Sequence, residues 1–237
     1  MQIDTFKVKE FPAIDQIGMS TGREKLRVCI VTEEIIGPVR NGGIASTYYH
    51  LSKGLAAHGH EVHVLFLKGR VVQDETPEHW VEHFAAFGVT LHYLEAPKAD
   101  LWGSSIEWQA RFGAAYAWLR DNPPFDVVHT SEWRGGMIYA LMAKRMGLAF
   151  RETLFLVKTS SPHIWNRHYQ MQPIEQRELV LAAYAEQKCV ELADAVIGGS
   201  AHLITFMEEI GYKVPDANVF VQPNIVDFSK VIVTDER

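Results

Sequence analysis

The sequence predicts an α/β protein built as a single doubly wound, Rossmann-like domain with a largely parallel sheet of about seven strands. Short apolar runs rich in β-branched residues alternate along the chain with segments whose apolar residues recur at helical spacing. Such β-α repetition requires right-handed crossovers, which place helices on both faces of a parallel sheet. No internal repeat, low-complexity tract or Gly/Ser linker divides residues 26–227, so we assign them to one domain behind an N-terminal arm at 1–25.

Each element is expected from its local pattern. The runs with the length and composition of strands are residues 26–34, 61–67, 89–95, 125–131, 153–160, 195–200 and 218–221. The segments with helical periodicity are residues 44–58, 77–86, 104–121, 136–147, 174–193 and 201–210. Glycine or proline follows most of the helices, at Gly59, Pro123, Gly147 and Gly211, where the backbone leaves the helical conformation.

Composition narrows the classes of function. The chain has 23 Lys and Arg against 29 Asp and Glu, a formal net charge of -6, so we expect no broad basic surface for nucleic acid or anionic lipid. No apolar run approaches the roughly 18 residues of a membrane span, and the polar start lacks the regions of a signal peptide. We therefore expect a cytoplasmic protein with no transmembrane segment. Cys29 and Cys189 fall in a predicted strand and a predicted helix, which favours buried thiols.

A glycine loop joins the first predicted strand to the first predicted helix. It reads Arg40-Asn41-Gly42-Gly43. Paired glycines let a ligand approach the backbone, and the unpaired N–H groups of a helix start attract an anion. Arg40 adds a positive charge. The loop therefore resembles a phosphate cradle, although Gly-Gly is a weaker signal than Gly-x-Gly-x-x-Gly.

Polar and aromatic side chains gather in the loops after two further strands. In a doubly wound sheet the ligand site lies beyond the carboxyl ends of the strands, where these loops meet. The loop after the fourth strand contains Glu132, Trp133 and Arg134, and the loop after the fifth strand runs from Thr159 to His168. Stackable Trp rings beside hydrogen-bonding groups suit a sugar, and arginines suit a phosphate.

Five segments in order resemble the N-terminal domain of retaining glycosyltransferases of the GT-B fold, a group that includes glycogen and starch synthases. The glycine loop resembles that family's Lys-x-Gly-Gly, and the segment Asp126-Val127-Val128-His129 with Glu132-Trp133 resembles its Asp-Val-Val-His-x-His-Asp-Trp. The remaining matches are residues 58–62, 186–200 and 222–227. The resemblance covers about residues 26–227 and implies that the chain is one half of a GT-B fold.

The sequence departs from the family pattern at several of these positions. Arg40 stands where the family has lysine, Glu132 where it has aspartate, and Ser131 where it has a second histidine. The family's Thr-x-His after the fifth strand reads here as Thr-Ser-Ser-Pro-His. The sequence leaves open whether Ser161 replaces the family histidine or His163 supplies that ring from two residues later.

The resemblance implies a function and a set of site residues. It implies transfer of a sugar from a nucleotide-diphosphate donor to a glycan or other small hydroxyl acceptor, with retained anomeric configuration and no cofactor beyond the donor. The absence of Asp-x-Asp favours a reaction without a metal ion. The residues carried over are Arg40, Gly42 and Gly43 for the donor diphosphate, His163 for catalysis, and Glu132, Trp133, Arg134, Ser161, Asn166 and Arg167 for the acceptor.

The resemblance also implies a partner domain. The family's second, C-terminal Rossmann domain binds the nucleotide sugar, and we interpret residues 228–237 as the start of a linker toward it, so the 237-residue chain is expected to be inactive alone. Glu178 and Glu186 have the spacing of the Glu-x7-Glu motif of that second domain. Because they lie on a helix of the first domain, where residues eight apart share a face, we expect a solvated helix face.

Alternative functions remain open at this point. One is a noncatalytic module that binds a glycan or a phosphosugar, and a second is a dinucleotide-dependent enzyme. Against the second, the glycine loop lacks a third glycine, and the second strand ends without the acidic residue that binds ribose. A metal site at His58, His60 and His63 is disfavoured, because these residues straddle a helix end and a strand.

Overall fold

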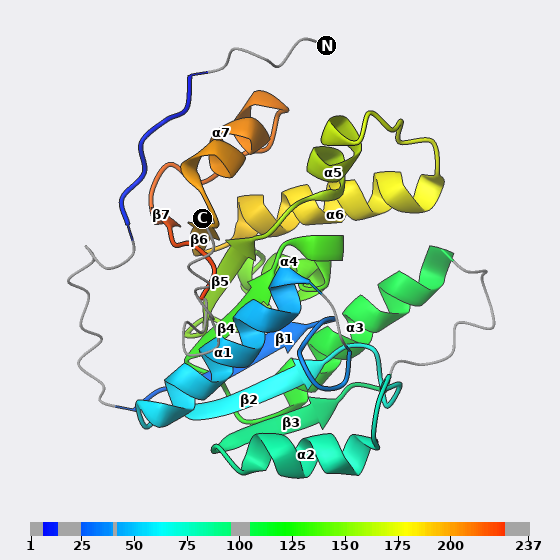
Figure 1. The fold of residues 1–237 in the computed structure, drawn as a ribbon. Coiled ribbons are helices and arrows are strands. Elements are labelled where there is room, and N and C mark those ends of the chain that lie inside the picture. The colour runs from blue at the N-terminus through cyan, green and yellow to red at the C-terminus, as the bar shows by residue number, and fades with distance from the viewer. Residues whose placement is uncertain (1–6, 14–24, 40–41, 96–104, 226–237) are drawn as a thin grey trace, which may run out of the picture.

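A computed structural model describes residues 7–13, 25–39, 42–95 and 105–225 (Figure 1). Within the last range, the side chains are described from residue 110 onward. Arg40 and the segment 228–237 lie outside the described residues. The strands are β1 (Arg27–Thr32), β2 (Glu61–Phe66), β3 (Val89–Tyr93), β4 (Val127–Ser131), β5 (Leu154–Thr159), β6 (Ala195–Gly198) and β7 (Val219–Val221).

All seven strands form one parallel sheet in the order β3-β2-β1-β4-β5-β6-β7. The prediction of a doubly wound Rossmann-like sheet is therefore confirmed. Each strand occupies the segment expected for it, with ends one or two residues shorter in most cases. The strand order reverses between β1 and β4, and in such sheets the crevice at this reversal is where ligands bind.

The helices alternate with the strands. They are α1 (Gly43–Ala57), α2 (Pro77–Ala85), α3 (Ser105–Asp121), α4 (Ile138–Arg145), α5 (His163–Tyr169), α6 (Arg177–Leu192) and α7 (Ala201–Glu209), with a 3₁₀ turn, η2 (Trp133–Gly135). The sequence predicted all but α5 and η2. These two were expected to be loop, because α5 is a single seven-residue stretch of mixed polar and aromatic residues and η2 has only three residues. Neither is long enough to show a helical period.

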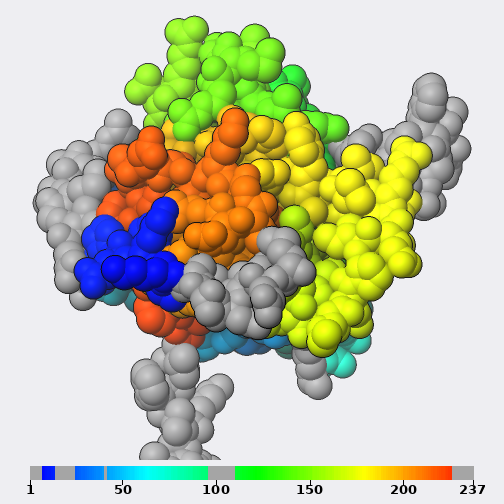
Figure 2. Space-filling view, turned by 90° about the horizontal axis from the view of Figure 1, so that it is seen from above, coloured from blue at the N-terminus to red at the C-terminus, as the bar shows by residue number. Residues whose placement is uncertain are grey.

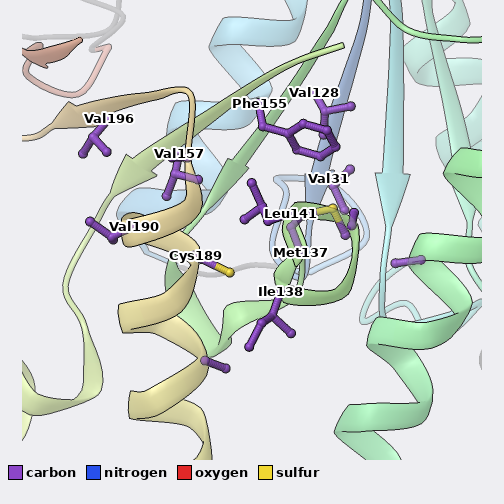
Figure 3. Close-up of a cluster of buried hydrophobic side chains, with 14 of the residues drawn as sticks. Val31, Val128, Met137, Ile138, Leu141, Phe155, Val157, Cys189, Val190 and Val196 are labelled. Atoms are coloured by element: carbon purple, nitrogen blue, oxygen red, sulfur yellow. The ribbon is translucent and has the colours of Figure 1, made fainter. Parts of the chain in front are cut away.

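The sheet has a separate hydrophobic core on each face, because successive side chains of a strand point to opposite sides. On one face, α1 and α2 cover Ile30 of β1 and its neighbours; the buried residues are Ile30, Ile35, Val39, Tyr48, Val62, Val64, Phe66, Phe84, Val89 and Leu91. The second core lies on the other face, beneath α3, α4, α6 and α7, and includes Cys29 and Val31 of β1. Figure 3 shows this second core, where Cys189 of α6 and Leu141 of α4 lie among Val31, Val128, Phe155 and Val157.

Both cysteines are free and buried, as predicted. Both lie in the second core, where burial raises the pKa of each thiol well above its usual value, since the thiolate would lose its solvation. No helix within the described ranges combines the length and the apolar character that crossing a bilayer requires.

Part of the N-terminal arm, residues 7–13, lies along the β7 edge of the sheet. Pro12 accepts a hydrogen bond from the amide of Val221 at 2.9 Å, and Ala13 forms a parallel bridge with the same residue. The amide of Lys9 donates to the Thr205 hydroxyl at 3.0 Å, and its Nζ lies 2.7 Å from Glu208 of α7. Figure 2 shows this blue segment seated against the orange surface of α7.

Candidate functional site

A hollow of about 450 Å³ opens at the carboxyl edge of the sheet, where the segments after β1, β4, β5 and β7 converge. Its size is within the usual range for small-molecule sites. Backbone and amide groups line it together with one indole, one carboxylate and one aliphatic side chain. The lining residues are Glu34, Gly42, Gly43, Ile44, Trp133, Ser160, Ser161, Asn166 and Asn224.

The start of α1 forms one wall of this hollow. Gly42 is the N-cap residue, no side chain caps the helix, and its first turn contains no acidic residue. A helix N-terminus without acidic side chains is a favourable position for an anion, because the helix dipole places partial positive charge there. A Cβ atom on Gly43 would lie 3.3 Å from Nδ2 of Asn224, so glycine here lets the segment after β7 approach the helix closely.

Trp133, in η2 after β4, forms the opposite wall. One face of its indole stacks on the imidazole of His163, with the ring centroids 4.2 Å apart and the planes 7° from parallel. His163 is the first residue of α5 and is 8% exposed. It does not line the hollow, so the structure places the predicted catalytic ring behind Trp133 rather than at the surface of the site.

A buried carboxylate on α6 holds both of these segments. Glu186 has no exposed surface. It accepts hydrogen bonds from the amide of Arg134 at 2.9 Å, from the amide of His163 at 2.9 Å and from Nδ1 of His163 at 2.6 Å. The expectation of a solvated helix face at Glu178 and Glu186 is therefore wrong for Glu186, which belongs to the buried stripe of α6 together with Ala182 and Cys189.

Glu132 is the second buried carboxylate of the site. It is fully buried, and its Oε1 accepts from the amides of Ser160 at 2.6 Å and Ser161 at 3.0 Å, while its Oε2 lies 2.8 Å from the Ser131 hydroxyl. Burial, followed by repulsion from Glu186, raises the pKa of Glu132 to about 7. Predicted to contact the acceptor, Glu132 instead lies below the hollow and ties the loop after β4 to the loop after β5.

Arg134 also turns away from the hollow. Its guanidinium pairs with Glu33 at 3.0 Å, and Arg111 of α3 pairs with the same carboxylate at 3.1 Å. The Arg134 backbone has φ 60° and that of Gly135 has φ 68°. A Cβ atom on Gly135 would lie 2.2 Å from Cβ of Ala185, so only glycine fits between η2 and α6.

The loop after β5 places its predicted residues in different surroundings. Ser161 and Asn166 line the hollow, and Nδ2 of Asn166 donates to the Ser161 carbonyl at 2.9 Å. Arg167 bonds instead to Gln172 at 2.5 Å, beyond the end of the site. Of the residues predicted from sequence, the hollow thus brings together Gly42, Gly43, Trp133, Ser161 and Asn166, whose contacts with ligand stay predictions.

Sequence reasoning missed several residues of the site. Glu34, Ile44, Ser160 and Asn224 line the hollow without having been predicted as site residues, although Ile44 and Ser160 adjoin predicted ones and Asn224 lies in the matched segment 222–227. Glu186 carried a usable signal, because it interrupts an otherwise apolar helical stripe. A carboxylate at such a position must be satisfied by buried donors.

The histidines considered as metal ligands have separate partners. Nδ1 of His58 lies 2.7 Å from the Gly54 carbonyl, that of His60 lies 3.3 Å from the Leu26 amide, and that of His63 lies 2.9 Å from Nε2 of His92. Across the described parts of the chain, no three His, Cys, Asp or Glu side chains are grouped so that they could hold a metal ion.

A family model for glycosyltransferase family 4 matches residues 41–230, which is most of the chain and contains every residue that lines the hollow except Glu34. The chain belongs to glycosyltransferase family 4. The matched range begins in the glycine loop and extends past Asn224, so eight of the nine lining residues of the hollow lie in the matched range.

Relatives of this family 4 domain are distant. Glycogen synthase of Aliivibrio salmonicida is 24% identical over 150 residues, which cover 51% of this chain and 31% of that protein. The catalytic domain of starch synthase IV from Arabidopsis thaliana, solved with ADP and acarbose, superposes with a TM-score of 0.57 at 11% identity, over 86% of this chain and 52% of that one.

The UGT2 enzyme of Phytolacca americana, solved with UDP-2-fluoroglucose and pterostilbene, superposes with a TM-score of 0.52 at 12% identity, over 83% of this chain and 52% of that one. At these identities the superpositions show the fold alone, and they confirm the expected GT-B architecture. The family 4 domain spans about half the length of these two structures.

Proposed function

We propose that this chain is the N-terminal, acceptor-binding domain of a retaining, nucleotide-sugar-dependent glycosyltransferase and that the hollow at the carboxyl edge of the sheet is its side of the active site. The observation that carries the proposal is that the helix start at Gly42 and Gly43 and the indole of Trp133 line the same hollow. The first suits a phosphate and the second a sugar ring.

On the donor side, the helix start of α1 would stabilise the departing diphosphate. As the bond between the anomeric carbon and the diphosphate oxygen breaks, negative charge grows on the leaving group, and helix N–H groups preorganised toward it favour that state. Arg40, in the same loop, would add its charge. The diphosphate keeps the electron pair of the broken bond and can take the proton of the acceptor hydroxyl.

On the acceptor side, the indole of Trp133 offers the apolar surface and the neighbouring loop offers polar atoms. Ser161 and Asn166 place hydroxyl and amide groups at the rim, and Glu34 adds a carboxylate that can accept from sugar hydroxyls. This combination fits a ring with apolar CH faces and hydroxyl edges. We propose a glycan or small hydroxyl acceptor and a reaction that needs no cofactor or metal ion, in a cytoplasmic enzyme.

Binding of oligosaccharide to the chain tests the acceptor assignment. We expect maltoheptaose or another gluco-oligosaccharide of a panel to bind in isothermal titration calorimetry, and Trp133→Ala to weaken that binding about tenfold through loss of stacking worth about 1.5 kcal/mol. Tyr184→Ala, which removes an aromatic ring that is 55% exposed on α6, is the matched control and should leave the affinity unchanged. Equal affinities of the wild type and Trp133→Ala would refute this acceptor site.

Transfer assays test the reaction itself. We propose that the chain alone transfers no sugar from UDP-glucose or ADP-glucose, because a further Rossmann domain binds the nucleotide. A version of the protein that is extended by that domain should transfer sugar. Glycan binding that persists without transfer by the extended version would favour the noncatalytic binding module.

A further inference from the structure

Two segments that shape the hollow converge on the same side chain of α6. The carboxylate of Glu186 accepts the amide of Arg134 with Oε1 and the amide of His163 with Oε2. The first amide belongs to η2, directly after Trp133, and the second begins α5, which leads to Asn166. One side chain thus sets the distance between the loop after β4 and the loop after β5.

The same carboxylate also orients the imidazole that lies behind Trp133. Nδ1 of His163 is 2.6 Å from Oε1 of Glu186, and the ring stacks on Trp133 at 4.2 Å. A carboxylate oxygen only accepts, so the ring must carry its hydrogen on Nδ1. The orientation of His163 and the plane of the indole are therefore fixed together.

The backbone between these residues is held in a costly conformation. Arg134 is a nonglycine residue with φ 60°, a region that costs about 1 kcal/mol or more for an L-residue. Its amide reaches Glu186 in this conformation, and Gly135 next to it lies against Ala185, the residue before Glu186. Residues held in this way are typical of functional sites.

We propose that Glu186 is a positioning residue of the site, which holds Trp133 and His163 in one rigid stack and so fixes the aromatic wall of the hollow. The inference rests on the proposed function in that the wall is taken to receive the acceptor. Burying a carboxylate is costly unless donors satisfy it, and here the donors are the groups whose positions define the wall. Glu132 does the same for the amides of Ser160 and Ser161, which also line the hollow.

Nuclear magnetic resonance of ¹⁵N-labelled histidine and tryptophan tests the proposal without any ligand. In the wild type we expect His163 in the Nδ1–H form and Trp133 indole signals displaced by the stacked imidazole. Glu186→Gln keeps the size of the side chain but presents an NH₂ group to one of the donors, so the Nδ1–H signature should be lost and the Trp133 signals should move.

Glu186→Asp provides a second variant for the case that Glu186→Gln does not fold. It keeps the charge and shortens the side chain by one methylene, so it should disturb the same ring signals. Glu178→Gln is the matched control, because it removes a carboxylate from the same helix two turns earlier. It should leave the signals of both rings in place. The Nε2–H form of His163 in the wild type, or unchanged ring signals in folded Glu186→Gln, would overturn the proposal.

Glycan binding links the stack to function. We expect Glu186→Gln to raise the dissociation constant for the oligosaccharide that binds the wild type by about tenfold or more, as loss of a supporting partner does at other preorganised sites. Unchanged affinity in a variant with altered ring signals would refute the role in acceptor binding. If the wild type binds no glycan, the proposed function fails, whereas the ring signals still decide whether Glu186 positions the stack.

Discussion

The two edges of the sheet contain the same kinds of polar residue arranged in opposite ways. At the carboxyl edge, Glu132 and Glu186 are fully buried and accept hydrogen bonds from loop amides. At the amino edge, Glu61 is 46% exposed at its side chain and pairs with Arg27 at 2.8 Å and with His63 at 3.0 Å. Glu132 and Glu186 thus bind backbone amides of loops, whereas Glu61 binds two side chains, Arg27 of the neighbouring strand and His63 of its own strand.

The polar side chains of the amino edge bind mainly to one another and to adjacent strands. The guanidinium of Arg27 lies 4.1 Å over the Phe125 ring, and its backbone amide donates to Asp126. His63 and His92 are stacked and hydrogen bonded to each other. These contacts join adjacent strands and their connections, and they hold no loop over a hollow.

The difference shows how the position of a charged side chain in an α/β fold separates stability from function. An exposed ion pair costs little to keep and contributes little when present. A buried carboxylate lowers the stability of the fold unless several hydrogen-bond donors satisfy it. At the carboxyl edge, the buried carboxylates therefore lower folding stability while they fix the geometry of the loops, as preorganised sites require.

Substitutions of Gly135 and Gly59 should show the largest difference in the free energy of unfolding between the two edges. Both have positive φ, 68° and 86°, so alanine strains the backbone at each. Only at Gly135 would the new Cβ atom collide with Ala185, at 2.2 Å, while Gly59 has open space around it. We expect urea denaturation to show a loss of about 4 kcal/mol for Gly135→Ala and about 1 kcal/mol for Gly59→Ala. Similar losses at the two positions would contradict tight packing of η2 on α6.

Removal of one carboxylate at each edge should give the next largest contrast. Glu132→Ala removes the acceptor of the half-buried amides of Ser160 and Ser161, and we expect the free energy of unfolding to fall by about 2 kcal/mol. Glu61→Ala breaks exposed pairs and should cost below about 1 kcal/mol. Chemical denaturation of both variants at pH 7.5 measures this difference, and equal losses would remove the distinction drawn between buried and exposed carboxylates.

The pH dependence of stability should have opposite signs for Glu132 and for His92 of β3, which stacks on His63. Burial raises the pKa of Glu132 from 4.5 to about 7, so the folded state keeps a proton that the unfolded state loses between these values. Stability from this group falls as the pH rises through that window, by about 3 kcal/mol in total, and the full penalty remains above pH 7.

Burial lowers the pKa of His92 from 6.5 to about 4, so between these values the unfolded state holds the extra proton and stability rises with pH. Unfolding free energies measured from pH 4 to 8 separate the two groups. Glu132→Gln should make stability rise more steeply with pH than in the wild type, whereas His92→Gln should make it rise less. The same slope in all three proteins would show that neither shift is present.

The smallest expected effect compares the two ends of α1. Gly54 is exposed inside the helix, with nothing near a new Cβ atom, so Gly54→Ala should stabilise the protein by about 0.8 kcal/mol. Gly43 begins the same helix against Asn224, and alanine there must displace that side chain. We expect a smaller gain or none for Gly43→Ala in thermal denaturation. A full helical gain at Gly43 would show that Asn224 is not packed against the helix start.

Most of the fold could be predicted from the sequence because strand and helix periods are local properties. All seven strands and six of the helices lie where their patterns place them, but α5 is shorter than its period can reveal. The site was predictable only to the level of loops. The sequence indicates that Trp133 and Asn166 lie in loops at the carboxyl edge, but not that Glu132 points inward or that Arg134 turns to Glu33. The directions of these side chains depend on hydrogen-bond partners that are distant in the sequence, which no local pattern encodes.

The seating of the N-terminal arm has a consequence for how the chain folds. Lys9 donates to Thr205, a contact between residues 196 positions apart, and Pro12 and Ala13 pair with β7. Contacts of such long sequence separation form slowly, because the loop they close is large. During synthesis, residues 7–13 emerge first and must wait for α7 and β7 before they can dock. Until then β7, the edge strand among the described residues, lacks its contacts with Pro12 and Ala13, so we expect the chain to be most prone to intermolecular strand pairing in the interval between synthesis of β7 and docking of residues 7–13.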